Sequence, residues 1–212
     1  MNTPLSDHYT AFDGPRRLAT GSLETVTLAV QAAASQGAAG PLLMFDDRSG
    51  RTVDQDLRGD AQDLLARLAG QDRTDGQAAA AAASPAADAA TDDSPRGRGR
   101  PRLGVVAREV TLLPRHWDWL NAQTGGASVA LRKLVEAARR ANADLDAQRQ
   151  AQAAAYQVMS TLAGNLAGFE EASRALFAND LPRWQACMAD WPREVRDYAL
   201  RLAGVTATGA AD

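Results

Sequence analysis

The sequence predicts an α+β protein, and three observations support this prediction. Short, turn-bounded segments alternate with helical segments over residues 8–70, which is the pattern of a small ββαββα unit. Residues 77–93 carry no large apolar side chain, which is typical of a disordered linker. Residues 127–163 contain neither glycine nor proline, and shorter helical segments follow, so the rest of the chain is mostly α-helical.

The N-terminal unit begins with two short strands that turn at Gly14-Pro15. Ser22 is a helix cap, and Gly37 ends the helix that follows it. The apolar run PLLMFDD, residues 41–47, reads as a buried strand, and the turn RSG leads into a fourth strand, RTVDQDL. A helix opened by Asp60 completes a small α+β domain over residues 8–70, with both helices expected on one face of a four-stranded sheet.

A linker, residues 71–102, separates this domain from the next patterned segment, residues 103–141. That segment begins with the strand-like run VVAREVTLL and continues with a helix in which Pro114 occupies the first turn. The turn TGGAS then leads into a second helix. Residues 103–141 are therefore expected to form a strand-helix-helix unit.

The second helix carries an apolar stripe whose positions step by 3 and 4, and all but two of them are Leu, Ala or Met. The positions are 131, 134, 138, 141, 145, 148, 152, 155, 159 and 162, with Gln148 and Gln152 as the polar exceptions. The stripe is compatible with one long helix bearing a weak coiled-coil seam, or with two helices broken near Asn142. The two glutamines favour a break.

The C-terminal region, residues 142–204, ends in a predicted set of three short helices with junctions at Asn179-Asp180 and Trp191-Pro192. Their shared core is expected to contain Phe169, Leu176, Phe177, Trp184, Met188, Trp191, Tyr198 and Leu202.

Charge is distributed unevenly along the chain. The whole chain has a net charge of −3, but residues 95–140 hold ten basic and three acidic residues, a net +7. The other 13 basic and 23 acidic residues carry −10. In an otherwise acidic protein, one basic block creates a local positive potential that attracts a polyanion such as DNA.

Catalytic and metal-binding patterns do not emerge from the sequence. His8 and His116 lack partners at ligand or nucleophile–base spacing, and the lone Cys187 excludes an intramolecular disulfide. The chain also shows neither a phosphate-binding loop nor a dinucleotide fingerprint. It is predicted to be non-enzymatic and free of cofactors and metals. The absence of a signal peptide and of a long apolar run predicts a cytoplasmic protein with no membrane contact.

The basic block contains a short DNA-binding motif. RGRGRPR, residues 96–102, resembles the AT-hook, whose core is Arg-Gly-Arg-Pro and here is residues 98–101. A minor groove about 6 Å wide admits an extended chain only where glycine leaves room, so that arginines reach its electronegative floor. Chance occurrence in a chain rich in Arg, Gly and Pro is the alternative explanation of these seven residues.

The adjoining segment, residues 108–139, resembles the ribbon-helix-helix DNA-binding fold. That family binds DNA as a dimer whose paired strands enter the major groove, while the start of the second helix holds a phosphate. With Val110 and Leu112 facing the core, the outward residues are Glu109, Thr111 and Leu113, and only Thr111 is suited to reading a base. In the opposite phase Arg108 faces outward beside Val110 and Leu112. The alternative is a strand and helical hairpin that simply pack. The whole chain also resembles an uncharacterised bacterial family, a domain of unknown function, through segments such as YTAFDG, FDDRSGR and GGASVALRKLV.

Together these patterns predict a DNA-binding protein, a transcriptional regulator or nucleoid-associated factor, that acts as a homodimer with a possible preference for A·T-rich DNA. The expected DNA-binding residues are Arg96, Arg98, Arg100, Pro101, Arg102, Arg108, Thr111, Arg115, Gly126, Ser128, Arg132 and Lys133. The alternative is a protein–protein interaction or adaptor module, antitoxin-like, without nucleic-acid binding.

Overall fold

The computed structural model describes residues 8–59, 62–64, 66–67 and 108–205. The chain divides into two compact units. Unit 1 comprises residues 1–61 and 139–212, and unit 2 comprises residues 62–138. The fold is α+β, as predicted, with one small antiparallel sheet and a mostly helical C-terminal region.

The sheet of unit 1 consists of β1 (Tyr9–Asp13), β2 (Arg16–Gly21) and β3 (Leu42–Asp46), in the order β2-β1-β3. The predicted turn at Gly14-Pro15 joins β1 to β2. Helix α1 (Leu23–Gln36) is capped by Ser22, whose side chain accepts a hydrogen bond from the Thr25 N–H, and Gly37 ends it in a left-handed conformation. These local predictions are confirmed.

The predicted fourth strand is absent. Beyond β3 the described residues show only an isolated bridge between Phe45 and Thr52. Val53 and Leu57 still pack against the core beside α1, and the Val53 N–H donates to the Met44 carbonyl at 2.8 Å. The residues between them, Asp54 to Asp56, are polar types that are depleted in strands, and the ladder stops there. Of the helix predicted after Asp60, residues 62–64 and 66–67 are helical.

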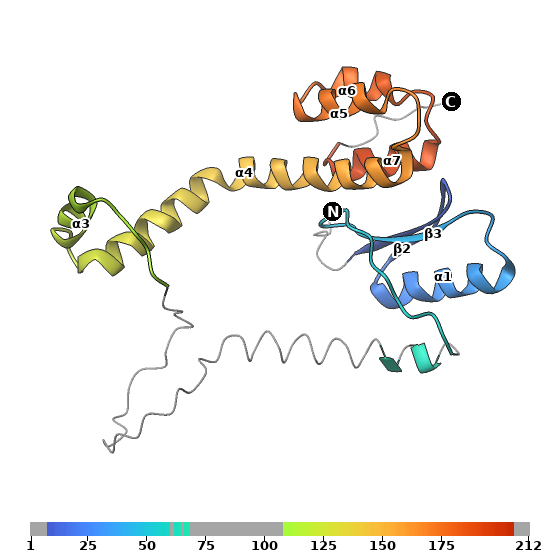
Figure 1. Ribbon diagram of the computed structural model, residues 1–212, viewed down its shortest axis with the longest axis horizontal. Helices are drawn as coiled ribbons and strands as arrows, with labels where there is room; N and C mark the ends of the chain where they lie inside the picture. Colours follow the sequence, from blue (N-terminus) through green and yellow to red (C-terminus); the bar gives the residue numbers. More distant parts are fainter. Residues whose placement is uncertain (1–7, 60–61, 65, 68–107, 206–212) are drawn as a thin grey trace, which may run out of the picture. The chain divides into compact units, whose positions relative to one another are not determined.

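Each face of the sheet is buried against a different partner, because side chains alternate along a strand. On one face, Ala11 and Met44 pack against Val26 and Val30 of α1. On the other face, Phe12 and Phe45 join the core of the C-terminal helices. Figure 1 shows the sheet of unit 1 lying between α1 and these helices.

The C-terminal helices are α4 (Gly126–Ala163), α5 (Phe169–Phe177), α6 (Leu181–Cys187) and α7 (Arg193–Leu202). The last three follow the predicted junctions: Asp180 caps α6 and Pro192 begins α7. Most of the predicted core residues are buried. Phe177 is the exception, at 56% exposed, although its ring lies 5.4 Å from that of Tyr156.

Helix α4 is continuous, so the break near Asn142, which the two glutamines favoured, was wrong. The Gln152 side-chain amide donates a hydrogen bond to the Leu176 carbonyl, 3.0 Å away at the end of α5. Because Gln152 has a polar partner and Gln148 is exposed, neither residue forces the helix to end.

A buried polar cluster joins the sheet to α7. The fully buried carboxylate of Asp47 accepts hydrogen bonds at Oδ1 from the hydroxyls of Thr10 and Tyr198, both at 2.8 Å. Arg201 forms an ion pair with Oδ2 at 3.1 Å and donates to the Thr10 hydroxyl. Burial and the nearby carboxylate raise the pKa of Tyr198, so its hydroxyl stays protonated and donates.

The ring of Tyr198 completes this junction. It lies 5.3 Å from the ring of Phe12 and 6.0 Å from that of Phe45. The turn after β3 also approaches α4 so closely that a Cβ on Gly50 would lie 2.1 Å from the Ala154 carbonyl oxygen. The segments 8–59 and 139–205 therefore share one core, which the predicted division into a separate N-terminal domain and helical region did not anticipate.

A second carboxylate, Asp13, holds the loop between α1 and β3. It accepts hydrogen bonds from the N–H groups of Gly40 at 2.6 Å and Ala39 at 3.2 Å, and Arg16 lies 3.6 Å away. The backbone hydrogen bonds lower the pKa of Asp13 below its ordinary value of 3.8.

Replacing Asp47 by Asn is expected to destabilise the protein by about 2–3 kcal/mol, because the substitution removes the charge that Arg201 faces and places an amide NH2 donor against the buried guanidinium in place of Oδ2. Equilibrium urea unfolding measures the loss. Asp146→Asn is the matched control, since Asp146 is exposed on α4 and pairs only with Arg149 across 3.5 Å. Equal losses in the two variants would show that the buried cluster contributes no more than a surface pair.

Replacing Asp13 by Asn is expected to lower the melting temperature at neutral pH, because an amide cannot accept both backbone hydrogen bonds. The folded-state pKa of Asp13 is lowered, so its contribution is complete above 3.8 and is lost as the pH falls below that value. The difference in melting temperature between the wild type and Asp13→Asn should therefore shrink from pH 7 to pH 3. A difference that stays constant over this range contradicts the assignment.

Candidate nucleic-acid interface

The described part of unit 2 is a helical hairpin preceded by an extended segment. Helix α3 (Pro114–Asn121) begins with a proline, which suits the first turn because it lacks the N–H that would have no acceptor there. Gly125 and Gly126 both have positive φ angles, 91° and 73°, and turn the chain into α4. Leu120 and Ala130 are buried and form the small interior of the hairpin.

The segment before α3, residues 108–113, belongs to no strand, so the predicted strand is not formed within one chain over its described part. Residues 105–107, the rest of that prediction, lie outside the described residues. A strand requires a hydrogen-bonded neighbour, and the described part of unit 2 contains no second strand to supply one. A ribbon formed between two copies would leave this segment without a ladder in a single chain.

Unit 2 exposes a large share of its apolar side chains. Five of them are between 48% and 64% exposed: Val110, Leu113, Trp119, Leu134 and Val135. Two of these five, Trp119 and Leu134, line a groove of about 260 Å³ together with Leu112, His116, Leu120 and Leu131. Contiguous apolar surface of this kind marks an interaction site. We call this surface, the five exposed side chains together with the groove, the apolar face of unit 2.

The predicted DNA-binding residues on α4 lie in its first two turns. Arg132 folds back on the helix start: its Nε donates to the Ser128 carbonyl at 3.1 Å, and its Nη2 lies 3.4 Å from the Ser128 hydroxyl. Lys133 is exposed, and Gly126 is the first residue of the helix. The structure therefore places one cation, Arg132, against the first turn of the helix, whose first N–H groups lack intrahelical acceptors.

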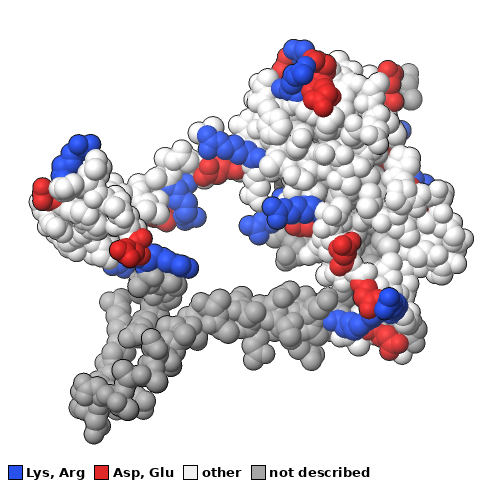
Figure 2. Space-filling view, in the orientation of Figure 1, with Lys and Arg blue, Asp and Glu red and all other residues white. Residues whose placement is uncertain are grey.

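The remaining predicted residues are distributed over two other segments. Arg108 and Thr111 are exposed on the segment before α3, and Arg115 is exposed in the first turn of α3. Figure 2 shows basic and acidic side chains interspersed over α3 and the start of α4, with much uncharged surface between them. The arm residues Arg96, Arg98, Arg100, Pro101 and Arg102 lie outside the described residues.

The exposure pattern bears on which side chains of residues 108–113 could read bases. Leu112 is half-buried and lines the groove, whereas its neighbours Thr111 and Leu113 are exposed. Leu112 and Thr111 therefore face as expected for a strand with Val110 and Leu112 on its inner side and Thr111 on its outer side. Val110 does not fit this expectation, because it is 52% exposed.

The buried polar cluster around Asp47 is not predicted by the sequence, in which Asp47 is only the last residue of a predicted buried strand. No short sequence motif predicts this cluster, because the residues that contact Asp47 are Thr10, Tyr198 and Arg201, which lie far from it in the sequence. A pocket of about 250 Å³ beside Asp47 is lined mainly by alanine and leucine side chains together with Arg48 and Gln150. The Asp47 carboxylate is directed to Thr10, Tyr198 and Arg201, so the cluster holds the fold together.

Two other kinds of site are absent from the described residues. They contain no group of three or more His, Cys, Asp or Glu side chains placed to hold a metal ion. Among the helices of the described ranges, none combines the length and apolar character required to cross a bilayer.

Comparisons with known proteins place the whole chain in one family. A search of curated proteins and a search of solved structures each found no match. The model of a family described as "Uncharacterized protein conserved in bacteria (DUF2239)" matches residues 8–203, which cover most of unit 1 and all of unit 2. The chain therefore belongs to the DUF2239 family of bacterial proteins.

Proposed function

We propose that this protein is a non-enzymatic DNA-binding protein that acts as a homodimer through unit 2. The observation that carries the proposal is the apolar face of unit 2, which adjoins an extended, unpaired segment and a basic arm. A monomeric domain of this size gains nothing from leaving Trp119 and four aliphatic side chains half-exposed. A second copy that pairs with residues 108–113 and covers the groove supplies the missing partner for both.

The ribbon-helix-helix resemblance gives this dimer a consistent geometry. Two copies of residues 108–113 would pair antiparallel about a two-fold axis, which completes the hydrogen bonds that one chain leaves unmade. Thr111 would then project from the ribbon on each copy. The ribbon offers few polar groups for reading bases, so most of the affinity must come from phosphate contacts.

Phosphate contact is assigned to the start of α4 and to the arm. The first N–H groups of a helix lack intrahelical acceptors and attract anions, and here Ser128 lies in the first turn, Arg132 donates to its carbonyl, and exposed Lys133 follows Arg132. Residues 108–138 alone hold four basic and three acidic residues, too small an excess to bind a polyanion strongly. The arginines of residues 96–102 add four charges without an acid, so the arm is the main electrostatic contribution.

The first prediction concerns the arm. The purified full chain should retard an A·T-rich duplex at low salt and release it as the salt concentration rises, because each phosphate contact displaces counterions. The double variant Arg98→Ala/Arg100→Ala should bind severalfold more weakly in the same assay.

The matched control for the arm is Arg48→Ala/Arg51→Ala, which removes two exposed arginines from the turn after β3. Its binding should equal that of the wild type. Equal losses in the two double variants would mean that only bulk charge matters. A failure of the wild type to retard DNA would overturn the proposal, and a dimer that binds no DNA would favour the adaptor alternative.

The second prediction concerns the apolar face. Trp119→Ala should weaken the dimer by about ten- to a hundredfold, because large aromatic side chains dominate protein interfaces. Sedimentation equilibrium or light scattering measures the mass over a range of concentrations. Phe177→Ala is the matched control, an equally exposed aromatic of unit 1 that should leave the mass unchanged. A Trp119→Ala protein that dimerises like the wild type would remove the apolar face from the interface.

A further inference from the structure

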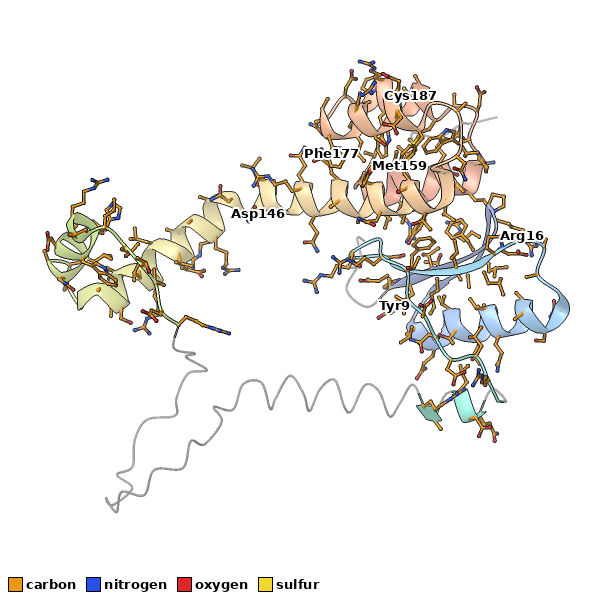
Figure 3. The ribbon with its side chains drawn as sticks, viewed as in Figure 1. Tyr9, Arg16, Asp146, Met159, Phe177 and Cys187 are labelled. Atoms are coloured by element: carbon orange, nitrogen blue, oxygen red, sulfur yellow. The ribbon has the colours of Figure 1, made fainter. Side chains whose placement is uncertain are left out.

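Strand β2 forms one edge of the sheet of unit 1, because the strand order is β2-β1-β3. Its inner side pairs with β1, and no described strand pairs with its outer side. Tyr9 and Arg16, labelled in Figure 3, mark the open end and the turn end of the β1–β2 hairpin. An edge strand presents backbone N–H and C=O groups to any extended chain that reaches it, so proteins commonly protect such edges.

The register of the hairpin determines which backbone groups of β2 face outward. Asp13 and Arg16 flank the two-residue turn, and a pair in that position exchanges backbone hydrogen bonds. The next residue, Arg17, therefore belongs to a non-hydrogen-bonded pair, and its N–H and C=O groups are directed away from β1. Leu18 lies in a bulge that shifts the alternation by one residue, so Thr20 is the next residue whose backbone groups face outward.

The outward N–H group of Arg17 already has an acceptor. It donates a hydrogen bond of 2.7 Å to Oε2 of Glu194, which lies in the first turn of α7. This carboxylate oxygen takes the place that the carbonyl oxygen of a further strand would occupy. A hydrogen bond to a carboxylate is stronger than one to a neutral carbonyl, so an incoming strand would have to displace a better acceptor than it brings.

We propose that Glu194 caps the outer edge of β2 and thereby prevents β2 from pairing with β2 of a second copy. In an antiparallel pair about a two-fold axis, Arg17 of each copy lies opposite Thr20 of the other, and these are the two residues with outward backbone groups. The same register places Arg16 opposite Gly21, so no two arginines face one another. The backbone of β2 is therefore complementary to its own copy, and Glu194 keeps this surface closed.

This inference concerns unit 1 alone. It depends neither on the proposed dimer through unit 2 nor on DNA binding, because β2 and α7 both belong to unit 1. It also assigns Glu194 a purpose that its exposed position on a helix end does not by itself suggest. The cap restricts self-association of the protein to surfaces other than the sheet edge.

Self-association of a Glu194→Ala variant tests the cap. The background is full-length Trp119→Ala, which weakens the proposed dimer through unit 2, so that new association comes from elsewhere. Glu194→Ala should raise the mass measured by sedimentation equilibrium towards that of a dimer, because the Arg17 N–H is left without its acceptor. Glu170→Ala is the matched control, since Glu170 is an exposed acid in the first turn of α5, and it should leave the mass unchanged.

Two further variants distinguish the sheet edge from other causes of association. Glu194→Gln retains a side-chain oxygen that can accept from the Arg17 N–H, so it should associate less than Glu194→Ala. Adding Thr20→Lys to Glu194→Ala should weaken the new association severalfold, because it places a lysine opposite Arg17 of the other copy. Thr20 is exposed, so the lysine side chain can reach solvent in the monomer.

Amide hydrogen exchange tests the contact without requiring Glu194→Ala to fold. In the Trp119→Ala protein, the Arg17 amide should exchange more slowly than the Thr20 amide. Both amides are directed outward from the sheet, and the Arg17 amide donates to Glu194.

The outcomes decide the inference separately from the proposed function. Association of Glu194→Ala but not of Glu170→Ala, weakened by Thr20→Lys, supports the cap, as does a protected Arg17 amide. Equal masses for Glu194→Ala and Glu170→Ala, association that Thr20→Lys does not weaken, or an Arg17 amide that exchanges as fast as that of Thr20 each overturns it. A Trp119→Ala background that is still a dimer contradicts the proposed interface of unit 2, and the cap is then tested by association beyond the dimer.

Discussion

The Asp47 carboxylate is the group on which the structure of unit 1 depends. It is fully buried, and burying a charge is tolerated only when hydrogen bonds and an opposite charge replace water. Thr10 supplies a hydroxyl from β1, while Tyr198 and Arg201 supply a hydroxyl and a guanidinium from successive turns of α7. The cluster therefore requires the two ends of the chain to be together before the charge can be buried. This requirement explains why the three-stranded sheet, which has too few residues for an independent core, occurs with the C-terminal helices behind it.

The sequence predicts the features that are encoded locally and misses those that depend on partners far along the chain. Gly14-Pro15, Ser22 and Gly37 determine a turn, a cap and a helix end through their own backbone and side-chain preferences, and all three were predicted. The continuity of α4 was not, because the polar Gln152 is satisfied by the Leu176 carbonyl, 24 residues away. The shared core of residues 8–59 and 139–205 likewise depends on contacts such as that between Tyr198 and Asp47, for which no spacing rule exists. The fourth strand failed although Val53 and Leu57 pack against the core, because the polar residues between them, Asp54 to Asp56, are of types depleted in strands.

The candidate site divides in the same way. The helix start at Gly126 and the proline-initiated α3 follow from local sequence, and the structure forms both. The pairing of residues 108–113 cannot be read from one chain, because the second strand of a ribbon lies in another molecule. The role of the arm, residues 96–102, is supported only by its composition and by its resemblance to the AT-hook motif. In a chain whose basic residues are almost all arginine, four arginines between glycines and prolines are weaker evidence than the same motif in a lysine-rich protein.

For this reason the apolar surface is a stronger argument for assembly than the basic block is for DNA. Compositional bias can produce arginine repeats, but it does not place leucines at intervals of 3 and 4 along one helix and then leave half of them exposed. The buried half of the α4 stripe shows what such a stripe does when a partner is present: Ala155 and Met159 are enclosed by the chain's own helices. Leu134 and Leu145 continue that stripe with the same spacing and are 48% and 51% exposed. A dimer formed through unit 2 would also present two arms at once, so each arm could be weak and the pair could still hold a duplex.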